Sequence, residues 1–384
     1  MSTVSPAVKI GLRFLGIWSD VSYSTIYWLS FMSSMLVIQY FQYMYIFEHL
    51  RISELSNLVD GLPMTLEYSL TFLKLTILWI QRRILHKILA SMDNDWHECI
   101  NTDHHLCIMT IKANISHFIS NAILSFTAIV AALYFLGEYA IRFVLLTENY
   151  NDTLRQLPLK LQFPFESQQS PIFEVLTVTI FLHLMLHACT VAILNGLIFT
   201  LVLHTSGQID IICQEFKNIS EKTLLQGSLA SSFGMLIKRH NRVISFSKNI
   251  EQLFSFIALM QVLWNTLVIC SIGFFLIVSI HNEASVFVLV KTVFAYCVIM
   301  VEAFIICFAG EHLSLKGKLI ANATYETLWY DMPVNTEKIL MFIIMRSQKR
   351  LTITAGKMID MSFETFANIM KASASYISVL NAMY

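Results

Sequence analysis

The stretch LTITAGKMIDMSFETFANIMKASASYISVL, residues 351–380, is long enough to cross a bilayer, yet it contains four charged side chains. At helical spacing its polar residues step by three or four and form one stripe: Lys357, Asp360, Glu364, Asn368, Lys371, Ser375 and Ser378. Ionisable groups at membrane depth are costly unless they face water or a partner. The stripe therefore indicates either a helix that lines an aqueous path or a polar seam buried between helices, with Lys357 paired to Asp360.

The charges of this segment lie in its first two-thirds, and the end from Ser375 to Leu380 is small, hydroxylated or apolar. A wetted vestibule that narrows to an apolar constriction would have this arrangement. Such constrictions gate ion flow by dewetting. If the helix lines a pore, Asp360 and Glu364 favour cations, and Lys371 tempers their field.

The composition of the whole chain is that of an integral membrane protein. Of 384 residues, 56% are hydrophobic and 14% are charged, and the mean hydropathy is +0.62. Soluble domains average about 25% charged residues. The net charge is zero, so no charge field suggests a nucleic-acid partner. The sequence has no catalytic or nucleotide-binding signature, so we expect neither an enzyme nor a cofactor.

The hydropathy pattern predicts an all-α, polytopic fold with seven transmembrane helices. Each span needs about 20 mostly apolar residues. Beside the last segment, six stretches qualify: 26–47, 62–81, 118–146, 172–204, 254–280 and 286–310. An excess of Lys and Arg indicates which loops face the cytoplasm. The N-terminal arm and the loops 82–117, 205–253 and 311–350 hold eighteen of these residues, and the other three loops hold three. We therefore predict a cytoplasmic N-terminus and an extracellular C-terminus.

The predicted topology has two consequences. The sequon at Asn151 lies in an outer loop, where glycosylation could occur. An inner N-terminus is the reverse of a G-protein-coupled receptor, which argues against the commonest seven-helix function.

Several spans place aromatic or ionisable residues where a small lipophilic ligand could bind. An apolar pocket with a few polar groups suits such a ligand. The candidate ligand-binding residues are Tyr68, Phe72, Phe135, Tyr139, Phe181, His183, His187, Phe294 and Tyr296. For any single ring, a position in the interfacial aromatic belt is an equal alternative.

Two pairs of polar residues within the spans have further interpretations. His183 and His187 have metal-ligand spacing, but no third ligand follows, so we predict a cavity-lining or hydrogen-bonded pair and no metal. Glu67 and Lys74 are two turns apart on one helical face.

The segment 337–349 contains seven consecutive apolar residues, Ile339–Met345, and is too short to span the membrane. A helix that is apolar all round must be buried somewhere. We interpret it as a packed cytoplasmic helix, a subunit contact, or both.

The last third of the chain resembles the insect odorant receptor family. The resemblance lies in an ordered series of motifs: YETLWYDMP at 325–333, RSQKRL at 346–351, TAGK at 354–357, SFETF at 362–366, KAS at 371–373 and SYISVL at 375–380. It implies an odorant-gated, non-selective cation channel that assembles with a co-receptor subunit, four subunits around one pore. It also implies residence in the plasma membrane, in sensory neuron dendrites.

The resemblance also implies roles for particular residues. The last helix would line the pore, with Val379 as the apolar gate and Met383 one turn beyond it, and 337–349 would enter a cytoplasmic bundle. The odorant pocket of the family lies in the outer half of the second, third, fourth and sixth helices. The short inner loop 205–253 favours a ligand-tuned subunit over the co-receptor.

The chain thus divides into helices one to six with the ligand pocket (1–310), a cytoplasmic anchor and subunit-contact segment (311–350) and the pore-lining helix (351–384). Two other functions remain open. One is a receptor that signals through a G protein. The other is a homomeric gustatory-type channel, although the ending SYISVLNAMY lacks the TYxxxxxQF of that sister family.

Overall fold

The computed structural model describes residues 2–18, 23–52, 55–145, 157, 159–222, 229–281 and 286–383. Seven of its helices cover the predicted spans: α2 (Ser24–Ile52), α3 (Leu55–Ile80), α5 (Asp103–Leu145), α6 (Ile172–Lys222), α7 (Leu229–His281), α8 (Val286–Tyr325) and α10 (Phe363–Met383). Shorter helices are α1 (Pro6–Phe14), α4 (Arg82–Cys99), α9 (Val334–Ser347) and the 3₁₀ turn η2 (Trp329–Asp331). Within the described residues, α5, α6, α7 and α8 are long and apolar enough to qualify as spans on those two criteria alone.

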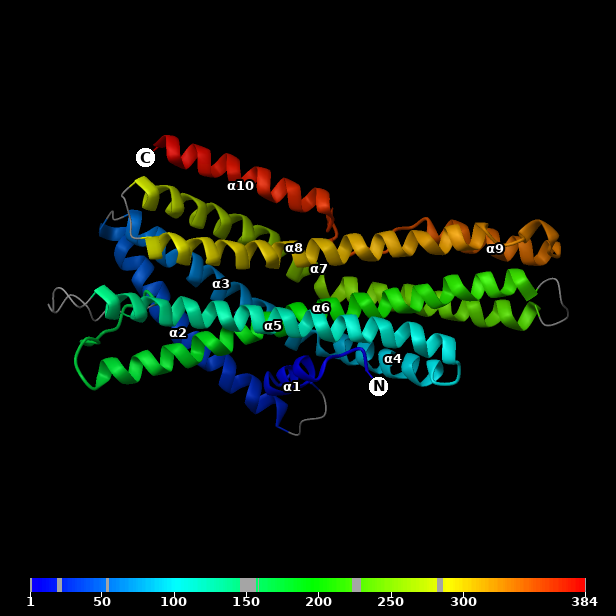
Figure 1. Ribbon diagram of the computed structural model, residues 1–384, viewed down its shortest axis with the longest axis horizontal. Helices are drawn as coiled ribbons and strands as arrows, with labels where there is room; N and C mark the ends of the chain where they lie inside the picture. The colour runs from blue at the N-terminus through cyan, green and yellow to red at the C-terminus, as the bar shows by residue number, and fades with distance from the viewer. Residues whose placement is uncertain are drawn as a thin grey trace.

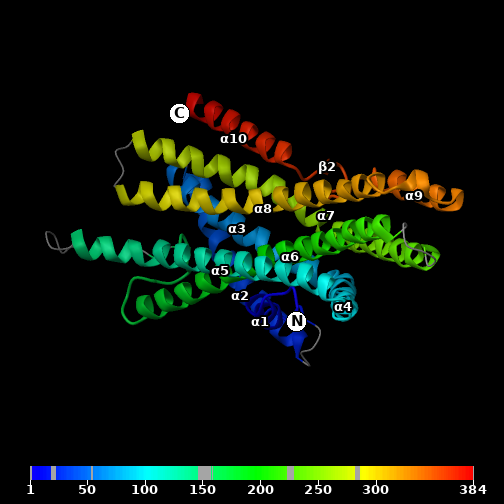
Figure 2. The same cartoon turned by 45° about the vertical axis from the view of Figure 1, so that its right-hand side comes forward.

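The long helices run along the length of the molecule, and α10 lies at one edge against α7 and α8 (Figure 1). After a 45° turn, α10 and α1 still lie on opposite sides (Figure 2). The α6 helix has 51 residues and is about 76 Å long at 1.5 Å per residue. The hydrocarbon core of a bilayer is about 30 Å thick, so a large part of α6 lies outside it.

The inner loops of the predicted topology are largely helical. Residues 205–222 and 229–253 continue α6 and α7, and 311–325 continues α8. These extensions bury a common core with α9, which includes Phe216, Phe233, Leu236, Ile320, Leu340 and Ile343. Hydropathy windows detect membrane spans, and they do not separate an extended cytoplasmic helix from a loop.

The start of the last helix differs from the prediction. Residues 354–360 form an antiparallel hairpin, with strand β1 (Thr354–Ala355) paired to strand β2 (Ile359–Asp360). Its turn holds Gly356 and Lys357 at φ values of 60° and 62°, which have the positive sign that a type I′ turn requires. The helical stripe therefore begins only at Glu364. Lys357 and Asp360 belong to the hairpin, and Asp360 pairs with Arg350 at 3.6 Å rather than with Lys357.

Met361, which directly follows the hairpin, packs closely on α8. A Cβ atom on Gly310 would lie 2.2 Å from the backbone oxygen of Met361. Only glycine permits this approach, because a real Cβ would overlap that oxygen. The packing fixes where α10 begins relative to the long helices.

Candidate functional site

A cavity of about 150 Å³ lies between α3, α5, α6, α7 and α8. Most of its wall is aliphatic or small, as at Ala131, Val191 and Ile272. Its polar lining residues are Glu67, Thr127, Tyr134, His187 and Thr292. An apolar wall with a few polar groups is the usual constitution of a site for a small molecule.

Beside the cavity lies a cluster of three ionisable groups, which we call the acidic cluster: Glu67, Lys74 and Glu302. The three side chains are at most 9% exposed. The Lys74 ammonium donates to the Glu302 carboxylate. The carboxyl of Glu67 lies near enough to interact electrostatically with both Glu302 and Lys74. Two carboxyl groups thus lie near one ammonium group, which donates to Glu302, and Glu67 lines the cavity.

Tyr68 and the two histidines form a stack next to the acidic cluster. The ring centroids of Tyr68 and His187 are 4.0 Å apart, and the planes are nearly parallel. The Tyr68 hydroxyl is 3.3 Å from Nδ1 of His183, and Nε2 of His187 is 3.1 Å from Oγ1 of Thr71. The histidines therefore engage a phenol and a hydroxyl, and no group of three His, Cys, Asp or Glu side chains among the described residues could hold a metal ion.

The other predicted ligand-binding residues lie at varying distances from the cavity. Phe135 and Phe181 contact each other with centroids 4.8 Å apart, in a buried cluster that includes the lining residues Ala131 and Leu184. Tyr296 is half-buried among residues that include Ile272 and Ile299 of the wall. Of the predicted set, His187 lines the cavity itself. Phe72 is half-buried and Phe294 is 44% exposed. The side chain of Tyr139 is not among those that the structure describes.

Sequence reasoning missed most of the lining residues, because small and aliphatic side chains carry no chemical signature. Ala131, Ala188, Ala295 and Val298 are ordinary membrane residues, and they line a cavity only because five helices converge there. Glu67 did carry a signal, since a charge inside a span marks a functional position. That signal predicted no partner, and the ion pair of Lys74 turns out to be with Glu302, which is 228 residues away.

Four of the predicted pore residues lie on one exposed side of α10, and Asp360 lies in the hairpin before it. Glu364, Lys371 and Ser375 are exposed, and Val379 is 57% exposed. The opposite side packs inward: Ile369 and Ser373 are buried, and Ile377 contacts α7 at Gly273. The side chain of Met383 and all of Asn151 lie outside the described residues, so the roles assigned to them stay predictions.

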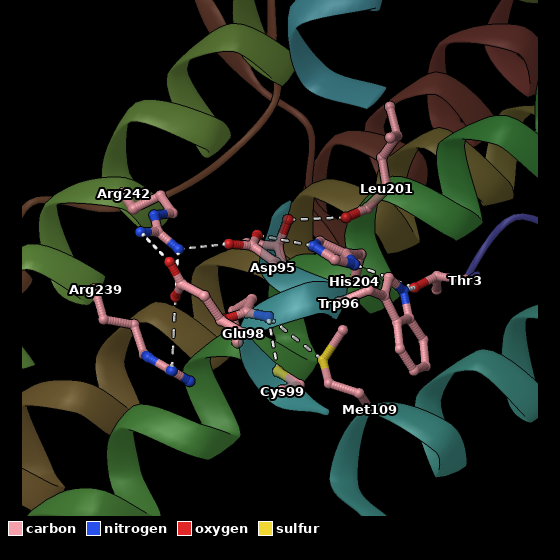
Figure 3. A network of polar contacts seen from close by, with 12 residues as sticks. Thr3, Asp95, Trp96, Glu98, Cys99, Met109, Leu201, His204, Arg239 and Arg242 are labelled. Carbon is pink, nitrogen blue, oxygen red and sulfur yellow. Dashed lines mark hydrogen bonds and ion pairs between the residues drawn. The ribbon is translucent and has the colours of Figure 1, made fainter. Parts of the chain in front are cut away.

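A second polar network joins the N-terminal segment to α4, α6 and α7 (Figure 3), and we call it the inner network. Indole Nε1–H of Trp96 donates to Oγ1 of Thr3 at 3.0 Å, and Oγ1 of Thr3 lies 3.1 Å from Nδ1 of His204. Nε2 of His204 is 3.1 Å from Asp95. The other oxygen of Asp95 accepts from Arg242 at 2.9 Å.

Arg242 also makes a two-pronged ion pair with Glu98 on α4, with N–O distances of 2.7 and 2.8 Å. The hydrogen bond from Arg242 and its charge hold the pKa of the Glu98 carboxyl below its usual range. Each charged member of the inner network therefore has a partner of opposite charge or a hydrogen-bond donor. This network fixes the packing of four chain segments.

Together the long apolar helices, the internal cavity and the buried ion pair within the predicted spans are those of a multi-pass α-helical membrane protein. The family model described as 7tm Odorant receptor matches residues 54–374. The chain belongs to this family.

Individual relatives agree with this assignment. The chain is 25% identical over 247 residues to odorant receptor 13a of Drosophila melanogaster, which covers 60% of this chain and 58% of that protein. It is 29% identical over 149 residues to odorant receptor 10 of Aedes albopictus, which covers 39% of each. The chain thus matches less than two-thirds of the length of either relative.

The fold is similar to that of the insect olfactory receptor OR5 from Machilis hrabei. The TM-score is 0.76 at 15% identity, over 97% of this chain and 96% of that one. For the structure of that receptor in complex with eugenol, the TM-score is 0.79 over 98% and 97% of the two chains.

Proposed function

We propose that this chain is the odorant-binding subunit of a ligand-gated, non-selective cation channel, and that it opens a pore together with a co-receptor subunit in the plasma membrane of a sensory neuron. A small volatile would occupy the cavity between α3, α5, α6, α7 and α8. Membership of the odorant receptor family and the mixed wall of that cavity support the ligand-binding part of the proposal.

The observation that carries the channel part is the exposed side of α10. Glu364 and Lys371 lie on it, while the other side of the helix is packed against the protein. A helix at membrane depth cannot present such groups to lipid without a large cost. Water in a pore, with the same helix of neighbouring subunits around it, would remove that cost.

The exposed side of α9 supports assembly with other subunits. Leu340 and Ile343 are buried, whereas Met341, Phe342 and Met345 are 54%, 65% and 57% exposed. Contiguous apolar side chains on a surface mark an interaction site. The α9 helix thus has one side that packs on its own chain and one exposed apolar side that would suit a partner subunit.

The test is to record membrane current from cells that express the chain alone or with the co-receptor, while a panel of volatiles is applied. We expect a rapid cation current only in co-expressing cells, insensitive to G-protein block. Current from the chain alone would show that it forms a homomeric channel and needs no co-receptor. Delayed current that disappears with G-protein block would overturn the channel proposal.

Two variants of α10 test the pore directly. Val379→Ala should alter gating, and Glu364→Gln should lower the preference for cations, because each changes the wall of the proposed pore. Glu174→Gln, an exposed carboxyl in the first turn of α6, is the matched control and should leave currents unchanged. Unchanged currents from correctly assembled Val379→Ala and Glu364→Gln complexes would remove α10 from the pore.

A further inference from the structure

The polar groups that line the cavity differ in whether they are available to hydrogen-bond a ligand. The Thr127 hydroxyl donates to the backbone oxygen of Ile123 at 2.9 Å. Nε2 of His187 lies 3.1 Å from the Thr71 hydroxyl. Tyr134 and Thr292 have partners as well. The hydroxyl hydrogen of Thr127 and Nε2 of His187 are therefore already engaged within the protein.

The carboxyl of Glu67 is different, because Glu67 and Glu302 both lie near a single basic side chain, Lys74. Lys74 is committed to Glu302, and both are at most 4% exposed. A carboxylate only accepts hydrogen bonds. A carboxylic acid that gives its proton to a neighbouring carboxylate also leaves an acceptor oxygen, so Glu67 offers an acceptor in either form.

The size of the cavity limits the ligand. A dry cavity of about 150 Å³ in another protein holds benzene, and this cavity has the same volume. A ring with one polar substituent is therefore the appropriate size, with the ring among Ala131, Val191 and Ile272 and the substituent towards Glu67.

We propose that the cavity selects small ligands that donate a hydrogen bond, such as alcohols and phenols, over ligands of the same size that can only accept one. The Glu67 carboxyl is the acceptor. This inference rests on the proposed function, because it assigns the ligand class of the same cavity. A buried acceptor without a donor is left with its desolvation cost, so an acceptor-only ligand loses more than one hydrogen bond.

Benzyl alcohol and anisole are the appropriate probes, because they are isomers with the same atoms and differ in whether the oxygen carries a hydrogen. The measurement is the ligand-induced rise in the unfolding midpoint of the full chain in lipid nanodiscs, which yields an apparent Kd. We expect benzyl alcohol to bind at least about tenfold more tightly than anisole, because hydrogen bonds to charged acceptors are strong.

Two variants locate the preference at Glu67. Glu67→Gln adds an amide donor at the same position and should bring the two isomers close to equal affinity. Glu67→Leu should abolish the preference, and the Lys74–Glu302 pair that remains is balanced in charge, which favours folding. The control Glu174→Gln should keep the full preference.

Equal binding of the isomers by the unmodified chain would overturn the inference, and so would a preference that survives both variants. Failure of both isomers to shift the midpoint would overturn it too. The assay needs no current, so a preference for benzyl alcohol in a chain that gives no odorant-evoked current would uphold the ligand class and reject the channel.

Discussion

The acidic cluster and the inner network each contain two carboxyl groups and a basic side chain, and they differ in how completely the carboxyl groups are paired. In the inner network, Asp95 uses one oxygen for His204 and the other for Arg242, and Glu98 receives two bonds from the same guanidinium. In the acidic cluster, two carboxyl groups depend on one lysine. A fully paired network fixes a packing arrangement, whereas a surplus acceptor beside a cavity can bind something else.

The largest expected effect is at Lys74. Lys74→Met leaves both carboxyl groups of the acidic cluster without a cation, and breaking a buried pair from one side costs about 3–5 kcal/mol. The measurement is the unfolding midpoint in nanodiscs. Lys316→Met is the control, because Asp210 keeps its second partner, Lys112. This control should cost about 1 kcal/mol or less. Equal losses from the two variants would contradict the buried pairing.

A smaller effect is expected at Asp95. Asp95→Asn keeps the size of the side chain but removes the charge that faces Arg242 and places an amide beside His204. Loss of one well-formed buried interaction costs about 1–3 kcal/mol. Hydrogen exchange should rise at residues 2–5, because Thr3 is held through His204. Unchanged exchange there would show that the contact between Asp95 and His204 does not hold the N-terminal segment in place.

The pH dependence of the inner network follows from Glu98. Its pKa is lower in the folded chain than in the unfolded chain, so its contribution to stability is complete above the unfolded value of about 4.3. That contribution is lost as the pH falls through the folded value. The difference in midpoint between the unmodified chain and Glu98→Gln should therefore shrink as the pH falls below about 4. A constant difference would exclude the charge of Glu98 as its source.

The smallest change in stability is expected at Asp360, whose pair with Arg350 is exposed on both sides. Asp360→Asn should alter the free energy of unfolding by about 0.5 kcal/mol or less. If Asp360 borders the entrance of the pore, the same variant should lower cation preference in recordings. A large loss of stability would mean that the pair is structural.

Much of the fold was predictable, because apolar segments of the right length directly report membrane helices. The predicted start of the last helix at 351 was wrong, because Gly356 and Lys357 adopt positive φ in a turn. The spacing of polar residues, on which the prediction rested, carries no information about backbone φ angles. One side of Ile339–Met345 is buried in its own chain and the other is exposed, so the subunit contact expected of this segment stays a prediction.

The site was less predictable than the fold. The predicted aromatic residues lie on helices that border the cavity, and of the predicted set His187 lies in its wall. The Lys74–Glu302 pair joins α3 to α8, and only tertiary packing brings these positions together. The sequence therefore showed which residues were unusual and could not show which of them meet.

The hairpin at 354–360 anchors the start of α10 to α7. Gly356 N–H donates to the Ser255 backbone oxygen at 2.9 Å, Lys357 N–H donates to the Ser255 hydroxyl at 3.2 Å, and Thr354 donates to Glu251 at 3.1 Å. The 21 residues of α10 span about 31 Å. A tilt of about 5° about the hairpin moves the far end by about 3 Å. The far part of α10 also contacts α7, where Ile377 meets Gly273, so a rotation of α7 would carry the part of α10 that holds Val379 with it.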